Sequence, residues 1–352
     1  MLTGMISSVS GKVDTSGANL TIDSDVLFDA GSSTNIAIGI NSMATGTTST
    51  AEHNTGIGKN TLTDLTQGDS NIAMSTNALA SLTTGGDNIA FGLNSGGTMT
   101  TGGKCVLIGT SAGTSISAAS VASDGTVAVG YQAGLAITTG QYNTYIGHQT
   151  GLENAIGDSN VAIGYNAMFG TLVSNQNDNN IAIGSENPDG TLAAMGGQWA
   201  GSASTNNVAI GTGSMAGAMN ASIHNVCIGS TAGTAITTGD ANVIIGSAAG
   251  LTIDTGGDNV CIGRQAGDGF DAEGGNIAIG AQALDGAVAG ADNCVVIGKQ
   301  AMRGAATIDG TIAIGYQALT ANTTGASNTA VGYQAGKLIT TGASNTILGQ
   351  GA

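Results

Sequence analysis

Acidic side chains are the residues of this chain best placed to do chemistry. The segment GDGFDAEGG (267–275) brings Asp268, Asp271 and Glu273 close together in sequence. Two carboxylates on either side of a glycosidic bond are the machinery of glycan hydrolysis, so a glycan-cleaving tailspike is one hypothesis. A glycine-rich acidic segment is also typical of a solvated turn. We favour the turn, expect no enzymatic activity and assign no catalytic residue.

A second set of carboxylates recurs at one place in a repeated phrase. Stacked turns would hold such like charges about 5 Å apart, where they repel or recruit a cation such as Ca²⁺. Asp69, Asp158 and Asp240 are the weak calcium candidates of this set. Asp is also a common turn former, and we prefer that interpretation, so neither a metal nor a cofactor is expected. The other members are Asp124, Asp178, Asp292 and Asp309.

Histidine and cysteine contribute little to a case for catalysis. His53, His148 and His224 have no nucleophile at a fixed spacing, and the four cysteines form no C-x-x-C pair. Cys227 and Cys261 fall at equivalent places two repeats apart, which is too far for a disulfide. We therefore predict buried thiols and no intrachain disulfide.

The composition excludes several classes of partner. With seven Lys and Arg and a net charge of −16, the chain cannot build a phosphate-binding surface, so nucleic acid is not expected. No apolar run approaches the roughly 20 residues of a spanning helix, so membrane insertion is not expected either. The opening MLTGMISSVSGK has no basic region followed by an apolar one, so we expect no secretory signal.

The elements that position these residues come from a repeated phrase, Asn-apolar-Ala-apolar-Gly. Of the seventeen intervals between its eighteen copies, eleven are 17 residues long. We number each copy from its first residue as position 0. The copies begin at Asn35, Asn54, Asn71, Asn88, Cys105, Thr126, Asn143, Asn160, Asn180, Asn207, Asn225, Asn242, Asn259, Asn276, Cys294, Thr311, Asn328 and Asn345.

This periodicity predicts an all-β fold, a parallel β-solenoid of about 18 coils of ~17 residues. Positions +1 and +3 are Ile or Val in most copies and share one strand face, which we predict to be the inner one. Positions 0, +2 and +4 share the other face, predicted to lie outside as a ladder of asparagines beside Ala and Gly. A second strand is predicted at x-[Asn/Gln]-Ala, as in 131–133.

A size relation between two positions indicates a packed interior. Where +8 is Gly, +11 is usually large, and where +8 is Leu or Met, +11 is usually small or polar; Leu65, Leu82 and Asn154 are exceptions. Such compensation is expected only where a fixed volume must be filled. Because each coil has a thin core, we expect other copies of the chain to complete the burial.

The phrase N-φ-A-φ-G-x-[NQ]-A resembles the head repeats of trimeric autotransporter adhesins, and the longer NTAVGYQAG…ITTG…N is similar to glycine-rich repeats of phage tail fibres. The resemblance covers roughly residues 35–352 and implies a left-handed β-roll of three chains, located on a virion or outside the cell. Autotransporters also need a secretory signal, a stalk and a membrane anchor, which we do not find, so the phage-type fibre is favoured.

Two ends and one long loop fall outside the regular pattern. Residues 1–34 are predicted to be an N-terminal cap or docking segment, with Leu20, Ile22, Val26 and Phe28 on strand faces, and residues 35–352 the repeat domain. The last copy stops after one strand, so Ile347 and Leu348 are docking candidates for the next molecule. The insertion loop 185–206 carries Trp199, a candidate contact to a cell-surface glycan.

These observations predict a structural fibre protein, a rigid trimeric rod with possible surface attachment. Two alternatives stay open. The first is a subunit of an extracellular filament that polymerises end to end. The second is the glycan-cleaving tailspike, which would need a working carboxylate pair.

Overall fold

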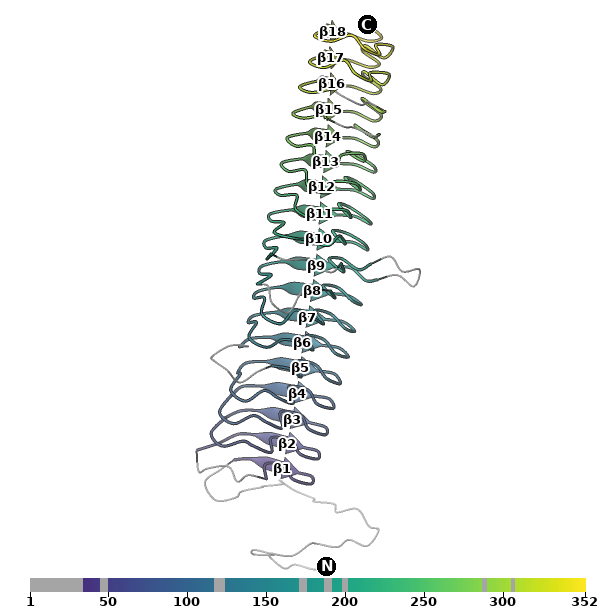
Figure 1. Cartoon of the computed structure of the whole chain (residues 1–352). Coiled ribbons are helices and arrows are strands. Elements are labelled where there is room, and N and C mark those ends of the chain that lie inside the picture. The colour runs from purple at the N-terminus through teal and green to yellow at the C-terminus, as the bar shows by residue number, and fades with distance from the viewer. Residues whose placement is uncertain are drawn as a thin grey trace, which may run out of the picture.

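The chain forms one long stack of coils, each contributing one short strand to a single parallel sheet (Figure 1). The computed structural model describes residues 34–44, 50–116, 124–170, 176–186, 192–197, 202–286, 290–304 and 308–352. The strands are β1 Ile36–Ile38, β2 Thr55–Ile57, β3 Ile72–Met74, β4 Ile89–Phe91, β5 Val106–Ile108, β6 Val127–Val129, β7 Thr144–Ile146, β8 Val161–Ile163, β9 Ile181–Ile183, β10 Val208–Ile210, β11 Val226–Ile228, β12 Val243–Ile245, β13 Val260–Ile262, β14 Ile277–Ile279, β15 Val295–Ile297, β16 Ile312–Ile314, β17 Thr329–Val331 and β18 Thr346–Leu348. The predicted all-β parallel solenoid of about 18 coils is therefore confirmed.

Every strand pairs with the next one in sequence, and always in the same register. Val243 of β12 lies opposite Val260 of β13, which in turn lies opposite Ile277 of β14. The pairing also continues from β9 to β10, across the longest interval between copies. Equivalent positions consequently stack into straight columns along the rod.

The strand faces are reversed relative to our prediction. Position +2 points into the coil: Ala162, Ala209 and Ala313 are fully buried. Positions +1 and +3 point outward, and Ile163 at +3 is 37% exposed. Alternation shows which residues share a face but not which face the chain encloses. A thin coil has room for alanine inside the strand, because its larger side chains enter from the turns.

The prediction of a second strand in each coil is also wrong. Residues 131–133 lie in a turn that follows β6. Gln132 at +6 has a φ of 53°, a left-handed conformation that a strand cannot contain. Among the described residues, each coil therefore contributes one strand to the sheet.

The size relation between +8 and +11 is confirmed by the packing. A Cβ on Gly134 would lie 2.5 Å from Cδ1 of Ile137, whereas in another coil Leu284 at +8 is itself buried. The exception Asn154 has a physical reason. Tyr145 points inward at +2, its ring occupies the space beside Gly151, and Asn154 Nδ2 donates to the Tyr145 hydroxyl at 2.8 Å.

The glycine at +4 allows neighbouring coils to approach closely. Gly246 has a φ of 140°, and a Cβ there would lie 2.5 Å from the carbonyl oxygen of Gly263 in the next coil. Ser75 occupies this position in one coil, with a φ of 100°. The column of glycines thus sets the spacing on one side of the strand.

In the parts of the chain described above, no helix has the length and apolarity to cross a membrane. The docking candidates Leu20, Ile22, Val26 and Phe28, and the receptor candidate Trp199, lie outside the described residues.

Candidate functional site

The largest candidate surface is the outer face of the sheet, which we call the outward face: the side chains at +1 and +3 of β1 to β18. Position +3 is apolar in every strand, and position +1 is Ile, Val or Thr. Ile38, Ile146 and Val331 are 47%, 40% and 37% exposed. Strands stacked about 4.8 Å apart make this stripe roughly 85 Å long and about 10 Å wide. An apolar stripe of that size is larger than the surface of a soluble monomer usually offers.

The asparagines at position 0 form the ladder that we predicted, but inside the rod. Asn242 Nδ2 donates to Asn225 Oδ1 at 3.0 Å and to the Gly256 carbonyl at 2.9 Å, and Asn242 Oδ1 accepts from the Asn259 backbone N–H at 3.0 Å. All three side chains are fully buried. Each amide therefore joins three successive coils and satisfies backbone groups that water cannot reach.

Cysteines interrupt this ladder at two places. Cys294 Sγ donates to the Ile308 carbonyl at 3.0 Å, and Cys105 Sγ to the Gly103 carbonyl at 3.4 Å. Burial is the main cause that raises the pKa of Cys105 to about 11 and that of Cys261 to about 12. All four cysteines are buried and outside any disulfide, which suits small structural residues rather than nucleophiles.

The aspartates two residues before the phrase link one coil to the next. The calcium candidates Asp69, Asp158 and Asp240 accept backbone N–H bonds from Glu52, Gln141 and Ile223, at 2.7, 2.8 and 2.6 Å. The other four aspartates accept in the same way from the preceding coil: Asp124 from Gly103, Asp178 from Asp158, Asp292 from Gly274 and Asp309 from Asp292.

Sequence reasoning missed this coil-linking bond, although the recurrence of Asp at one position was its signal. No group of three or more His, Cys, Asp or Glu side chains suited to a metal ion occurs among the residues that the structure describes. Calcium binding at Asp69, Asp158 and Asp240 stays a prediction.

The carboxylates of GDGFDAEGG take separate roles. Burial alone would raise the pKa of Glu273, but backbone N–H groups of Asp271, Gly290 and Ala272 bond its oxygens and lower the pKa below 4.5. Asp268 lies beside Asp285, and burial, followed by that neighbouring charge, raises its pKa. Glu273 therefore holds a turn as a buried carboxylate bonded to backbone N–H groups, rather than as a solvated one, and glycan cleavage stays an untested alternative.

Exposed rings at +5 stack into a column that sequence reasoning missed. The ring centroid of His148 lies 4.9 Å from that of Tyr131 and 5.3 Å from that of Tyr165. Tyr316 and Tyr333 stack in the same way at 5.2 Å. The signal was available, because all five residues fall at the same position of their copies.

A cavity of about 300 Å³ opens at the end of the first of these columns, and we call it the side cavity. Aromatic and aliphatic side chains share its lining with an amide and a carboxylate: it is lined by Tyr165, Asn166, Phe169, Glu186, Leu192, Ala193 and Gly196. Asn166 Nδ2 donates to Glu186 Oε2, and Asn166 Oδ1 is buried without a hydrogen-bond partner.

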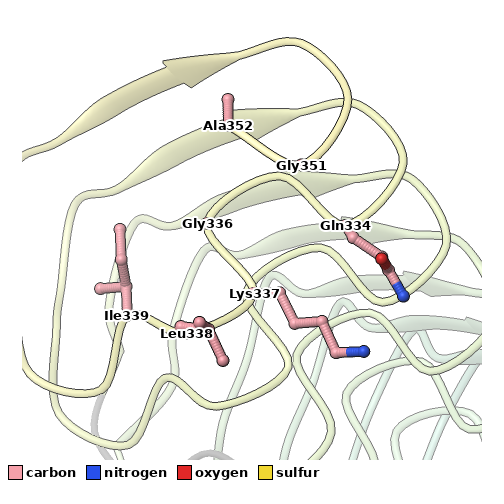
Figure 2. Close-up of a pocket in the computed structure, with 7 residues that line it drawn as sticks. All are labelled: Gln334, Gly336, Lys337, Leu338, Ile339, Gly351 and Ala352. Atoms are coloured by element: carbon pink, nitrogen blue, oxygen red, sulfur yellow. The ribbon is translucent and has the colours of Figure 1, made fainter.

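A second hollow, of about 540 Å³, lies against the last coil (Figure 2). Leu338, which lines it, is 88% exposed, and Leu348 of β18 is 68% exposed. Ile347, on the other strand face, is partly buried against the core. Docking of another segment on Ile347 and Leu348 stays a prediction.

Comparison of the chain with known proteins found no matching family model, no similar curated protein and no similar solved structure.

Proposed function

We propose that the protein is a structural fibre subunit, a rigid rod that works as a homotrimer on a virion or outside a cell. The observation that carries this proposal is the unbroken register of the sheet, in which each of the strands β1 to β18 pairs with the next. A continuous parallel ladder transmits force along its length through every coil. Mechanical reach is the function that such a shape supports best.

Side chains reinforce the backbone ladder at two sides of each coil. The buried asparagines join successive coils on one side, as Asn71 does with Asn54. The aspartates bond to the preceding coil on another, as Asp240 does with the Ile223 N–H. These bonds resist bending and shear of one coil against the next, which suits a rod rather than a flexible linker.

The outward face supports the trimeric assembly. Its estimated dimensions give roughly 850 Å² per chain, comparable with the ~800 Å² that each partner buries in a stable protein–protein interface. Its apolar ridges recur with the coil spacing, so a second copy presents ridges of identical pitch. Three copies around one axis would enclose each outward face between the two others. The left-handed course of the coils belongs to the same proposal.

Lysine substitutions on the outward face test the assembly. The double variant Ile210→Lys/Ile245→Lys places two charges on β10 and β12, where six ammonium groups would meet inside a trimer without partners. Burying an unpaired charge is costly, so we expect the variant to be monomeric by light scattering after size exclusion.

The matched control is Thr212→Lys/Ser247→Lys, which changes position +5 of the same two coils. It adds the same charge beside the outward face rather than on it, and should leave a trimer. A wild-type protein with the mass of one chain at micromolar concentration would contradict the trimer. Electron microscopy of the same samples checks the second element of the proposal: particles that are not rods would contradict it.

A further inference from the structure

We propose that the side cavity binds a neutral pyranose, the end unit of a glycan. The cavity lies between the coils of β8 and β9 and measures about 300 Å³, near the lower limit of small-molecule sites. This inference goes beyond the rod function and does not depend on it, because a single chain already contains every residue that the argument uses.

The aromatic wall arises where the column of stacked rings ends. On one side, the Tyr165 ring packs against His148 at an interplanar angle of 55°. In the next coil the equivalent residue is Ser185, whose Oγ accepts the Tyr165 backbone N–H at 3.2 Å. A small residue there leaves the far side of the Tyr165 ring without a stacked ring. Phe169 and Leu192 complete an apolar lining around it.

The polar lining arises from a break in a second column, at +6. Gln149 Nε2 donates at 2.9 Å to Gln132 Oε1 in the coil before it, whereas asparagines of this column such as Asn60 donate to the coil after them. The direction of donation reverses between Gln149 and Asn166, because the Asn166 amide donates forward to the carboxylate of Glu186. Its Oδ1 is left buried and without a partner. A buried acceptor without a donor is a group that a ligand can satisfy.

The chemistry of the lining selects the ligand. Its polar side chains are the Asn166 amide, the Glu186 carboxylate and the Tyr165 hydroxyl, and none of the described residues that line it is Lys or Arg. Phosphate, sulfate and acidic sugars therefore meet no counter-charge in this lining. A neutral pyranose fits both sides of the cavity: its C–H face stacks on an aromatic ring, and its hydroxyls donate to the amide and carboxylate oxygens.

Ligand-observed NMR with a panel of methyl pyranosides tests the proposal. The panel holds the methyl glycosides of glucose, galactose, mannose and N-acetylglucosamine, with butylammonium as a cationic contrast and sialic acid as an anionic one. We expect at least one neutral pyranoside to bind with a Kd of about 1 mM, the range of a single weak site. Neither charged probe should compete for it.

Two variants locate the binding. Tyr165→Ala should weaken it at least tenfold, and Glu186→Gln at least threefold. The matched control is Tyr131→Ala at the other end of the same column, where the exposed fraction is 45% against 43% for Tyr165; it should bind within twofold of wild type. Circular dichroism checks that each variant is folded. The proposal is overturned if no neutral pyranoside binds, if only butylammonium binds, or if Tyr131→Ala and Tyr165→Ala weaken binding equally.

Discussion

Replacing Asn71 by alanine tests whether the buried asparagine ladder holds the coils together. Asn71 Nδ2 donates to Asn54 Oδ1 at 3.0 Å and to the Gly85 carbonyl at 3.0 Å, and Asn71 Oδ1 accepts from the Asn88 backbone N–H at 3.1 Å. Asn54 Oδ1 keeps the backbone N–H of residue 71 at 2.9 Å after the substitution. Two buried backbone groups, the Gly85 carbonyl and the Asn88 N–H, lose their side-chain partner.

The expected cost follows from those two groups. Each buried backbone group left unsatisfied costs about 1–3 kcal/mol, so Asn71→Ala should destabilise its surroundings by about 2–6 kcal/mol. The matched control lies in the same coil. Asn77 also bonds amides on both sides, at 3.0 Å to Asn60 and 2.9 Å to Asn94, but it is only half-buried. Water can replace its bonds, so Asn77→Gly, which tolerates the φ of 57° there, should cost below about 1 kcal/mol.

Native-state hydrogen exchange is the suitable assay, because a solenoid opens locally rather than as one unit. Exchange of the β3 and β4 amides should accelerate roughly 30-fold to 10⁴-fold in Asn71→Ala, at one decade per 1.4 kcal/mol. The amides of β12, far along the rod, should not change. Equal acceleration in Asn71→Ala and Asn77→Gly would refute the argument that burial makes this ladder matter.

Three further predictions concern glycine, titration and thiols. Gly246→Ala should lower the local free energy of unfolding by about 2 kcal/mol or more, because its Cβ would overlap a carbonyl oxygen 2.5 Å away. Ser75→Gly should instead raise the free energy of unfolding. Denaturation curves that give both variants the stability of wild type would contradict both predictions. Backbone N–H bonds lower the pKa of Glu273 in the folded protein. The ionised Glu273 carboxylate therefore stabilises the fold above pH 4.5, and this contribution is lost as the pH falls through the lower folded-state pKa. Wild type should therefore be more stable than Glu273→Gln at pH 7, and this difference should narrow on acidification. Asp268→Asn removes a carboxylate of raised pKa, so it should stabilise the protein at pH 7 and lose that advantage in acid. Melting temperatures measured across this pH range check both predictions. Because burial raises the pKa of Cys105 to about 11, native protein should resist iodoacetamide at pH 8 and react only after unfolding, as mass spectrometry will show.

The number of coils and their strands could be predicted because the spacing between copies of the phrase gives the length of each coil directly. Every copy of the phrase became one strand, even where Cys105 or Thr311 replaced the asparagine. The inner and outer faces could not be predicted in the same way. Alternation places Val243 and Ile244 in two different sets without showing which set the coil encloses. The usual rule that Ile and Val lie inside fails here because the turns fill the core: Leu319 at +8 and Ile253 at +11 are fully buried.

The side-chain columns could be predicted from the repeat, whereas the side cavity could not. Columns such as Tyr131, His148 and Tyr165 follow from the repeat alone, since equal positions stack wherever the register holds. The side cavity does not follow from it. Its shape depends on Ser185 replacing an aromatic ring and on the carboxylate of Glu186 accepting from Asn166 where other coils pair two amides, and both are properties of one coil rather than of the period.

The reversed faces connect the fold of one chain to the proposed assembly. On the strands, the inward positions are mostly Ala and Asn, such as the fully buried Ala128 and Asn160, and alanine buries little apolar area per residue. The larger apolar side chains of the strands, such as Ile163 at 37% exposure, remain outside, where only another molecule can remove them from water. In the proposed trimer, burial of these side chains would add hydrophobic stabilisation that a single chain lacks. The proposed trimer therefore predicts that stability rises with protein concentration.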